Sequence, residues 1–418
     1  MHFMYFSHIK KSDPLVFEII QKEIQRQKDG LAMIPSENYA SMPVLEAMST
    51  PLSNKYAEGY PKKRYYTGNE HIDEIEELAI ERAKKLFKSE HANVQPNAGS
   101  GANIAVYLAL LEQGDTVMGM KLDQGGHLTH GHKVNASGKL YRFVQYGVDE
   151  KTERLDMDEI RDIALREKPK MIVTGATAYP RTIDFEAFRK ICNEVGAILL
   201  ADISHIVGMC ISGDHPSPFS AADVIMTTTH KTLRGPRSAV IVCREEFAKK
   251  IDRAIFPGTQ GGPMEHIIAA KAVCFQEAMT KDFQEYGHQI VKNAKTLETS
   301  LLGEGLSLVS GGTDNHLLLI NCVSLNISGR EGSDALAQCG IYTNRNTIPN
   351  DPGSAFEPSG IRIGTPALTT RGMKEKEMEF IGKAISKILK NPKNEKIATE
   401  TKQEVLELSK NFPIYPEF

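Results

Sequence analysis

The sequence is poor in cysteine and has no long hydrophobic run. Its six cysteines lie far apart over 418 residues, and no two form a Cys-x-x-Cys pair. This spacing argues against a disulfide framework and against a zinc site built on paired cysteines. No apolar run reaches the ~18 residues of a membrane-spanning helix, and the first residues do not form the apolar core of a secretory signal. We therefore expect reduced, buried thiols, a cytoplasmic location and no membrane partner.

An excess of charge of one sign is also missing. Lysine and arginine number 50, aspartate and glutamate number 53, and the formal net charge is −3. Nucleic acids and anionic membranes are bound by concentrated positive charge, so neither is an expected partner. The charged fraction of 25% and the hydrophobic fraction of 41% are typical of an ordinary globular protein.

Short apolar runs alternate with helical patterns between about residue 92 and residue 242. The runs cover residues 116–120, 171–175, 197–203, 223–227 and 239–243. This alternation favours an α/β fold with a mostly parallel sheet that is covered on both faces. Beyond residue 311 we expect two further strands and two helices, at residues 316–320, 360–364, 332–339 and 374–389. They favour a second, smaller α/β domain.

Three segments are expected along the chain. Residues 1–66 would form an N-terminal arm and dimer loop, residues 67–280 a large domain, and residues 281–418 a small C-terminal domain. The arm contains a long stretch that is rich in Pro, Gly, Ser, Asn and Tyr and has little periodicity. A long irregular segment in a compact protein is usually functional.

The most informative stretch is T-T-T-H-K-T-L-R-G-P-R at residues 227–237. It places Lys231 directly after an apolar run and before a Gly-Pro turn. Burial at such a strand end disfavours the ammonium form and makes the amine nucleophilic, as Schiff-base chemistry requires. A second apolar run ends at Asp202, a carboxylate that can hold a pyridinium nitrogen. A lysine and an acid of this kind are the two fixed points of a pyridoxal phosphate (PLP) site.

Two further motifs fit the same chemistry. Gly99 and Ser100 open an apolar helix, where free backbone N–H groups and the helix dipole favour a phosphate. Residues 125–132 contain three histidines but no nearby cysteine or carboxylate ligands, so we expect no metal there. A flat imidazole stacked on a flat pyridine ring is the better use of His127.

Taken together, these motifs resemble serine hydroxymethyltransferase, a PLP enzyme that moves a one-carbon unit between serine and tetrahydrofolate. The resemblance runs from about Leu31 to about Met373. It implies fold type I of the PLP-dependent transferases, with a mostly parallel, seven-stranded type of sheet, assembled as a homodimer or tetramer. It also implies reversible conversion of L-serine and tetrahydrofolate to glycine and 5,10-methylenetetrahydrofolate.

The resemblance implies three groups of site residues in this sequence. The catalytic residues would be Lys231, Glu58, His127, Asp202, His205, His230 and Tyr66. The cofactor would be bound by Gly99, Ser100, Thr177, Asp202, His205, Lys231, Tyr56, Gly261 and Gly262. Substrate and folate would be bound by Ser36, Tyr65, Tyr66, Leu122, Gly126, His127, Leu128, Asn346, Ser354, Ala355, Phe356 and Arg362.

For two of these residues, side-chain chemistry alone also suggests a role. A carboxyl among aromatic side chains, as at Glu58, can serve as an acid near neutrality. Arg362 lies in the middle of an apolar strand, where a charge has no other obvious use, and its fork matches an amino-acid carboxylate. The resemblance implies in addition that Gly261 and Gly262 reach the phosphate of the neighbouring subunit.

The chain departs from the usual residues of the family at several positions, namely Asn97, Ala98, Gly101, Asp123, Gln124, Thr177 and Ala355. Two alternatives therefore stay open. A folate-independent aldolase or an α-methylserine-type hydroxymethyltransferase would share every PLP residue. A non-catalytic PLP-binding protein would be expected to lack Lys231, Glu58 or Arg362, all of which are present.

Overall fold

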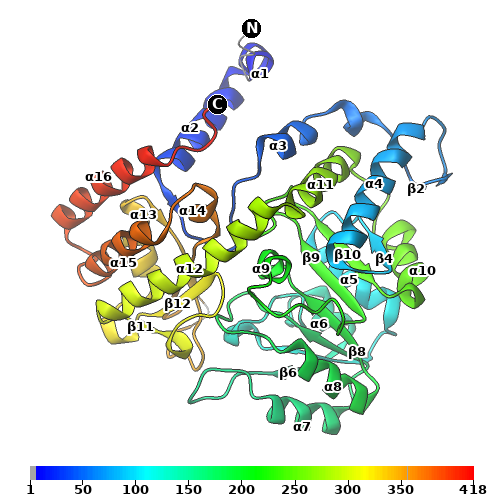
Figure 1. Ribbon diagram of the computed structural model, residues 1–418. Helices are drawn as coiled ribbons and strands as arrows, with labels where there is room; N and C mark the ends of the chain where they lie inside the picture. The colour runs from blue at the N-terminus through cyan, green and yellow to red at the C-terminus, as the bar shows by residue number, and fades with distance from the viewer. Residues whose placement is uncertain (1–5, 355) are drawn as a thin grey trace.

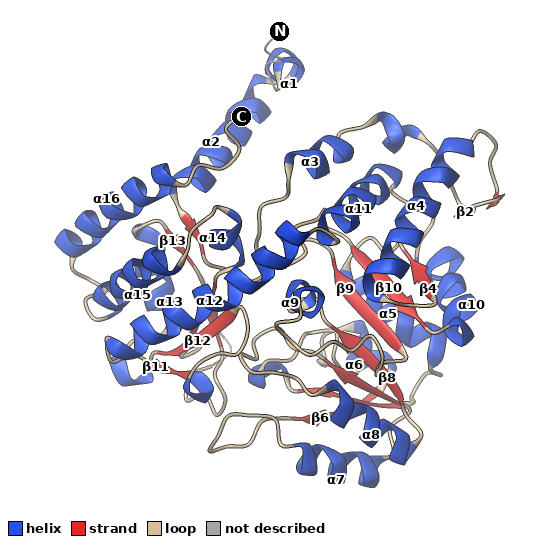
Figure 2. Ribbon diagram, viewed as in Figure 1, coloured by secondary structure: helices blue, strands red, loops and turns tan. Residues whose placement is uncertain are grey.

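A seven-stranded sheet forms the centre of the larger α/β unit (Figure 2). The computed structural model describes residues 6–354 and 356–418, and in it the strand order is β4-β10-β9-β8-β7-β5-β6. The strands are β4 (His91–Asn93), β5 (Thr116–Met120), β6 (Arg142–Tyr146), β7 (Met171–Thr174), β8 (Ile198–Asp202), β9 (Val224–Thr228) and β10 (Ala239–Cys243). Pairing is parallel from β6 through β9, whereas β10 is antiparallel to both of its neighbours. The predicted, mostly parallel sheet is confirmed, and β4 and β6 are strands that the prediction did not contain.

Both faces of this sheet are buried. Successive residues of a strand point to opposite faces, and Leu199 and Leu200 of β8 accordingly join two different hydrophobic clusters. Helices α4 (Glu70–Phe87) and α11 (Glu265–Ala278) contribute to the first cluster, and α5 (Gly99–Leu110) contributes to the second. This burial of both faces explains why the sequences of the strands are continuous apolar runs rather than alternating ones.

The smaller unit is built on a four-stranded antiparallel sheet of order β11-β12-β15-β14. Its strands are β11 (Ser307–Leu308), β12 (Leu317–Asn321), β14 (Asn344–Asn346) and β15 (Gly360–Gly364), and its main helices are α13 (Gly329–Gln338), α15 (Glu375–Leu389) and α16 (Glu395–Asn411). The strand β1 (Leu31–Ala32) pairs in parallel with β13 (Ile341–Tyr342), and Leu31 and Met33 are buried in the core of this unit. The N-terminal arm therefore packs on the C-terminal part of the chain.

Helix α12 (Lys281–Gly303) connects the two units. Its first half contributes Phe283 and Ile290 to the core of the larger unit, and its second half contributes Leu297 and Leu301 to the core of the smaller one. The residues from 264 to 291 follow one helical pattern in the sequence, but the structure divides this region into α11 and α12. The hydroxyl of Thr280 accepts a hydrogen bond from the backbone N–H of Phe283 and so caps the second helix.

Helices α1 (Ser7–Ser12) and α2 (Pro14–Asp29) project from the rest of the chain (Figure 1). No residue of α2 is buried, and Leu15 and Ile19 are 72% and 64% exposed. The six cysteines are buried and unpaired, which confirms the expected free thiols. Within the described residues, no helix is both long and apolar enough to cross a membrane.

Candidate active site

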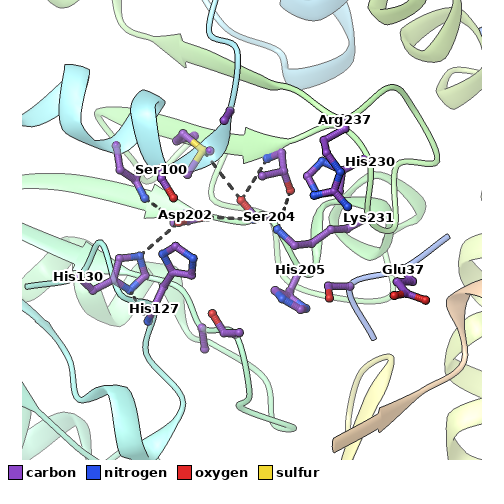
Figure 3. A pocket seen from close by; sticks show the side chains of 18 residues that line it. Glu37, Ser100, His127, His130, Asp202, Ser204, His205, His230, Lys231 and Arg237 are labelled. Carbon is purple, nitrogen blue, oxygen red and sulfur yellow. Dashed lines mark hydrogen bonds and ion pairs between the residues drawn. The ribbon is translucent and has the colours of Figure 1, made fainter. Parts of the chain in front are cut away.

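Several predicted site residues meet in one cavity of about 360 Å³ (Figure 3). The cavity lies where strands β8 and β9 end and where helix α5 begins, so loops at the carboxyl ends of parallel strands form its walls. The predicted residues that line it are Ser36, Gly99, Ser100, His127, Thr177, Asp202, His205, His230 and Lys231.

Lys231 presents its amine inside this cavity. Its Nζ donates a hydrogen bond to Oγ1 of Thr228 at 2.9 Å. Burial lowers the pKa of this amine to about 8; the nearby carboxylate of Asp202 opposes the shift, and the charge of Arg362 adds to it. A substantial share of the amine is therefore neutral, and nucleophilic, in mildly alkaline solution.

Asp202 is a buried carboxylate with a full set of donors. It accepts hydrogen bonds from Nδ2 of Asn103 at 2.9 Å and from the backbone N–H of Ser204 at 3.2 Å, and it pairs with Nε2 of His130 at 3.2 Å. Burial alone would raise the pKa of this carboxyl, but the bonds and charge of His130 hold it below its usual range. Asp202 is thus ionised at physiological pH and can keep a ring nitrogen protonated.

Asn103 and His130 were not predicted as site residues. Each belongs to a motif that was singled out for another residue, G-S-G-A-N in the first case and G-G-H-L-T-H in the second. The sequence did contain a sign of the role of Asn103, because this polar residue lies in an otherwise apolar helical segment. In the structure, Asn103 is fully buried in α5. A buried amide needs partners, and the Asp202 carboxylate provides one.

The start of helix α5 is shaped for a small anion. Its N-cap, Ala98, has no side chain that could occupy the first free N–H groups of the helix. A Cβ added to Gly99 would lie 2.6 Å from Cγ2 of Thr228, so glycine is required at this close approach. Ser100 and Arg237 line the same cavity and supply a hydroxyl and a positive charge. A phosphate group fits these donors.

Two histidines of the cavity, His127 and His230, are uncharged. Burial lowers the pKa of His127 to about 4 and that of His230 to about 3. Nδ1 of His127 is hydrogen-bonded to the hydroxyl of Thr129 at 2.7 Å, which fixes the plane of the ring. A neutral, fixed imidazole is suited to stacking on a protonated pyridine ring. With the amine, the carboxylate and the helix N-terminus, the cavity provides each group that PLP requires.

Arg362 reaches the cavity wall from the smaller unit. Strand β15 carries it, and its Nη1 donates to the backbone oxygen of Thr177 at 2.6 Å while its Nε donates to Oδ1 of Asn344 at 3.1 Å. Arg362 is 6% exposed, and burial lowers the pKa of its guanidinium to about 10. In the part of the chain that the structure describes, no carboxylate lies within ion-pair distance of it. A buried cation without a counter-ion favours a bound carboxylate.

A second group of predicted residues does not line the Lys231 cavity. These residues are Glu58, Tyr56, Tyr65, Tyr66, Gly261 and Gly262. Glu58 lies beside the two glycines, because a Cβ added to Gly261 would be 3.5 Å from Oε1 of Glu58. The rings of Tyr56 and Tyr65 are 63% and 74% exposed. Within one chain, the structure therefore brings these residues together with one another and not with Lys231.

A buried network that the sequence did not reveal holds the loop of Glu58. Nη1 of Arg64 donates to the backbone oxygens of Ala57 and Gly59, the two residues that flank Glu58. Nη2 of Arg64 donates to Glu76 at 2.6 Å, and Gln95 donates both to Glu76 and to the oxygen of Gly59. One buried carboxylate, Glu76, thus anchors both side chains that fix the backbone around Glu58.

The residues expected on the folate side lie outside the cavity lining. Leu122 and Leu128 are 37% and 44% exposed, and Phe356 is 83% exposed. Gly126 is required by its turn, since a Cβ there would meet the oxygen of Met120 at 2.2 Å. The further members of this group are Asn346 on β14 and Ser354 in the following loop, and Ala355 lies outside the described residues. Their role in folate binding stays a prediction.

The Glu76 network leads to a test of stability. Replacing Glu76 by leucine removes the most buried partner of the Arg64 guanidinium and leaves it only the ion pair with Asp73. We expect a loss of about 3 kcal/mol in the free energy of unfolding, the low end for a broken buried pair. The matched control is Glu77→Leu on the same helix, which removes an exposed ion pair with Lys62 and should leave the free energy of unfolding nearly unchanged. Urea unfolding measures both. If Glu76→Leu loses no more stability than Glu77→Leu, the buried network does not contribute to the stability of the fold.

Comparison with known proteins agrees with this site. A sequence profile of the serine hydroxymethyltransferase family matches residues 9–385. A protein of Prochlorococcus marinus (strain AS9601) named serine hydroxymethyltransferase is 54% identical to this chain over 409 residues, which is 98% of this chain and 97% of that protein. The match covers the cavity residues of the larger unit and Arg362 of the smaller one. The chain therefore belongs to the serine hydroxymethyltransferase family.

Proposed function

We infer that this chain catalyses the reversible transfer of the serine hydroxymethyl group to tetrahydrofolate, with PLP as its cofactor. The observation that carries this inference is the pairing, in one cavity, of the low-pKa amine of Lys231 with the ionised carboxylate of Asp202. When bound, PLP supplies an electron sink for the negative charge that develops at the α-carbon of the substrate.

Different residues of the cavity hold different parts of the cofactor and the substrate. Lys231 would provide the amine that holds the cofactor, and Asp202 would keep a proton on the ring nitrogen. The free N–H groups around Gly99 would hold the phosphate, and His127 would stack on the ring. Arg362 binds the substrate carboxylate and so sets the orientation of the bonds at the α-carbon.

Glu58 is proposed to transfer a proton at the hydroxymethyl oxygen. Because it does not line the cavity of its own chain, we propose a homodimer in which each subunit completes the site of its partner. The loop around Tyr56 and Tyr65 and the turn at Gly261 would be the shared elements. Their exposed aromatic side chains, together with the exposed apolar side chains of helix α2, support the presence of a partner subunit.

The first prediction concerns Lys231. Borohydride reduction followed by peptide mapping should place a pyridoxyl group on this residue. Because only the neutral amine attacks the cofactor, its attachment to cofactor-free protein should accelerate as the pH rises, with a midpoint near the lowered pKa of about 8. Label on another lysine, or a midpoint at the usual lysine value, would contradict this assignment.

A second prediction separates Glu58 from Arg362. Glu58→Gln should leave PLP and glycine binding nearly intact and lower folate-dependent serine cleavage by roughly 10²- to 10⁴-fold, since it removes a proton-transfer group. Arg362→Ala should weaken serine and glycine binding by roughly 3 kcal/mol, since it removes a charged hydrogen-bonding partner of the carboxylate.

The measurements are steady-state kinetics and glycine titrations, with serine cleavage followed in the presence and absence of tetrahydrofolate. Arg362→Lys is the matched control, because it keeps the charge but lacks the fork. Equal changes in binding and turnover for both variants would contradict the division of roles. Serine cleavage of equal rate with and without tetrahydrofolate would favour the folate-independent aldolase.

The shared site leads to a complementation test. Lys231→Ala and Glu58→Gln homodimers are each expected to be impaired, but mixed dimers should contain one site with both residues intact. Subunit exchange should therefore give each mixed dimer up to about half of the activity of the unmodified dimer. If exchange is demonstrated by mass and no activity returns, the site is built within one chain.

A further inference from the structure

A buried pair of histidines joins the two α/β units beside the cavity. Nδ1 of His205 lies 3.2 Å from Nε2 of His316, and the two ring centroids are 5.4 Å apart. His205 follows strand β8 and lines the cavity (Figure 3), whereas His316 directly precedes strand β12 and is fully buried. The pair is thus a direct hydrogen bond between the cavity wall and the smaller unit.

Both rings are neutral at physiological pH. Burial lowers the pKa of His205 well below its ordinary value, and the charges of Lys231 and Arg362 lower it further. Burial likewise lowers the pKa of His316 to about 3. A bond between two neutral imidazoles contains one proton, so one ring donates and the other accepts.

The environment of His316 indicates which ring donates. Its second nitrogen, Nδ1, is buried and has no hydrogen-bond partner among the residues that the structure describes. If His205 donated, His316 would carry its own proton on Nδ1, as a buried N–H without an acceptor. If His316 donates through Nε2, the unpartnered atom is a lone pair, which folded proteins tolerate better than an orphaned N–H. The second arrangement puts the proton of His205 on Nε2, the nitrogen that remains for the cavity.

The two nearby cations do not require the opposite arrangement. Nζ of Lys231 donates to Thr228, and Arg362 donates to Thr177 and Asn344. Among the hydrogen bonds of the described residues, neither cation donates to His205. Nε2 of His205 therefore does not need to be an acceptor within the chain.

The backbone around His316 is held by both units. Its oxygen accepts from the N–H of Thr365, and the side chain of the preceding Asn315 donates to the oxygen of Tyr179 in the larger unit. Strand β12, which begins at the next residue, pairs with β15 and places Leu319 opposite Arg362. His316, directly before β12, and Arg362 of β15 thus come from neighbouring segments of the smaller unit.

We propose that His316 is a positioning residue that fixes His205 as a neutral hydrogen-bond donor toward the cavity. The atom that His205 recognises is then an acceptor oxygen, as found on the phenolate of PLP or on a substrate carboxylate. The identity of the bound molecule rests on the proposed function, whereas the position of the proton on His205 does not.

The first test measures the protons on cofactor-free protein. In a solid-state ¹⁵N spectrum of histidine-labelled protein, with signals assigned through His205→Gln and His316→Gln, both rings should be protonated at Nε2 and unprotonated at Nδ1. The reverse pattern, with both protons on Nδ1, would overturn the proposal. Because this readout needs no cofactor, it stays decisive even if PLP does not bind.

The second test measures PLP affinity and the absorption band of the bound cofactor. His316→Phe removes the donor, and we expect about tenfold weaker PLP binding with a shifted band. His316→Gln places an amide N–H near the same position and should stay within about twofold of the unmodified protein. Equal losses in the two variants would indicate packing alone and contradict the proposal.

A buried histidine that lies near His316 but outside the cavity lining provides the control. His215 is buried and accepts from the N–H of Ile183 without lining the cavity. His215→Gln should lower the melting temperature and leave both the PLP affinity and the absorption band unchanged. A change in the band in this variant would mean that the spectrum reports general loosening rather than the proton on His205. If the unmodified protein binds no PLP, the proposed function fails while the ¹⁵N pattern still decides this inference.

Discussion

The active site depends on keeping one buried carboxylate ionised. Asp202 is 8% exposed, and a carboxylate in such a place would take up a proton if nothing compensated for the loss of water. Asn103, Ser204 and His130 provide that compensation. Only an ionised Asp202 can keep a pyridine nitrogen protonated, so the electron-withdrawing chemistry proposed for the cavity depends on these donors.

The fold brings the remaining groups to Asp202 through its two units. The large sheet places Lys231 and Asp202 at the ends of neighbouring strands, and helix α5 points its free N–H groups at the same space. The smaller unit adds Arg362 and His316, which come from two paired strands. Because helix α12 is part of both cores, the two units share a continuous element next to the site.

The sequence predicted those parts of the site that lie in contiguous motifs. The strand ends at Asp202 and Lys231, the helix start at Gly99 and the mid-strand Arg362 could each be identified from immediate neighbours. Contacts between distant segments could not. Asn103 and Asp202 are 99 positions apart, and His205 and His316 are 111 positions apart. In the sequence, Glu76 looks like one of many charged residues on an amphipathic helix, because no neighbouring residue indicates that Arg64 and Gln95 will contact it.

The state of Asp202 can be measured most directly on the cofactor itself. With PLP labelled by ¹⁵N at its ring nitrogen, we predict a protonated nitrogen in the unmodified protein up to mildly alkaline pH. We predict an unprotonated nitrogen in Asp202→Asn, with the cofactor still attached at Lys231. A ring nitrogen that carries the same proton in both proteins would contradict this role of Asp202.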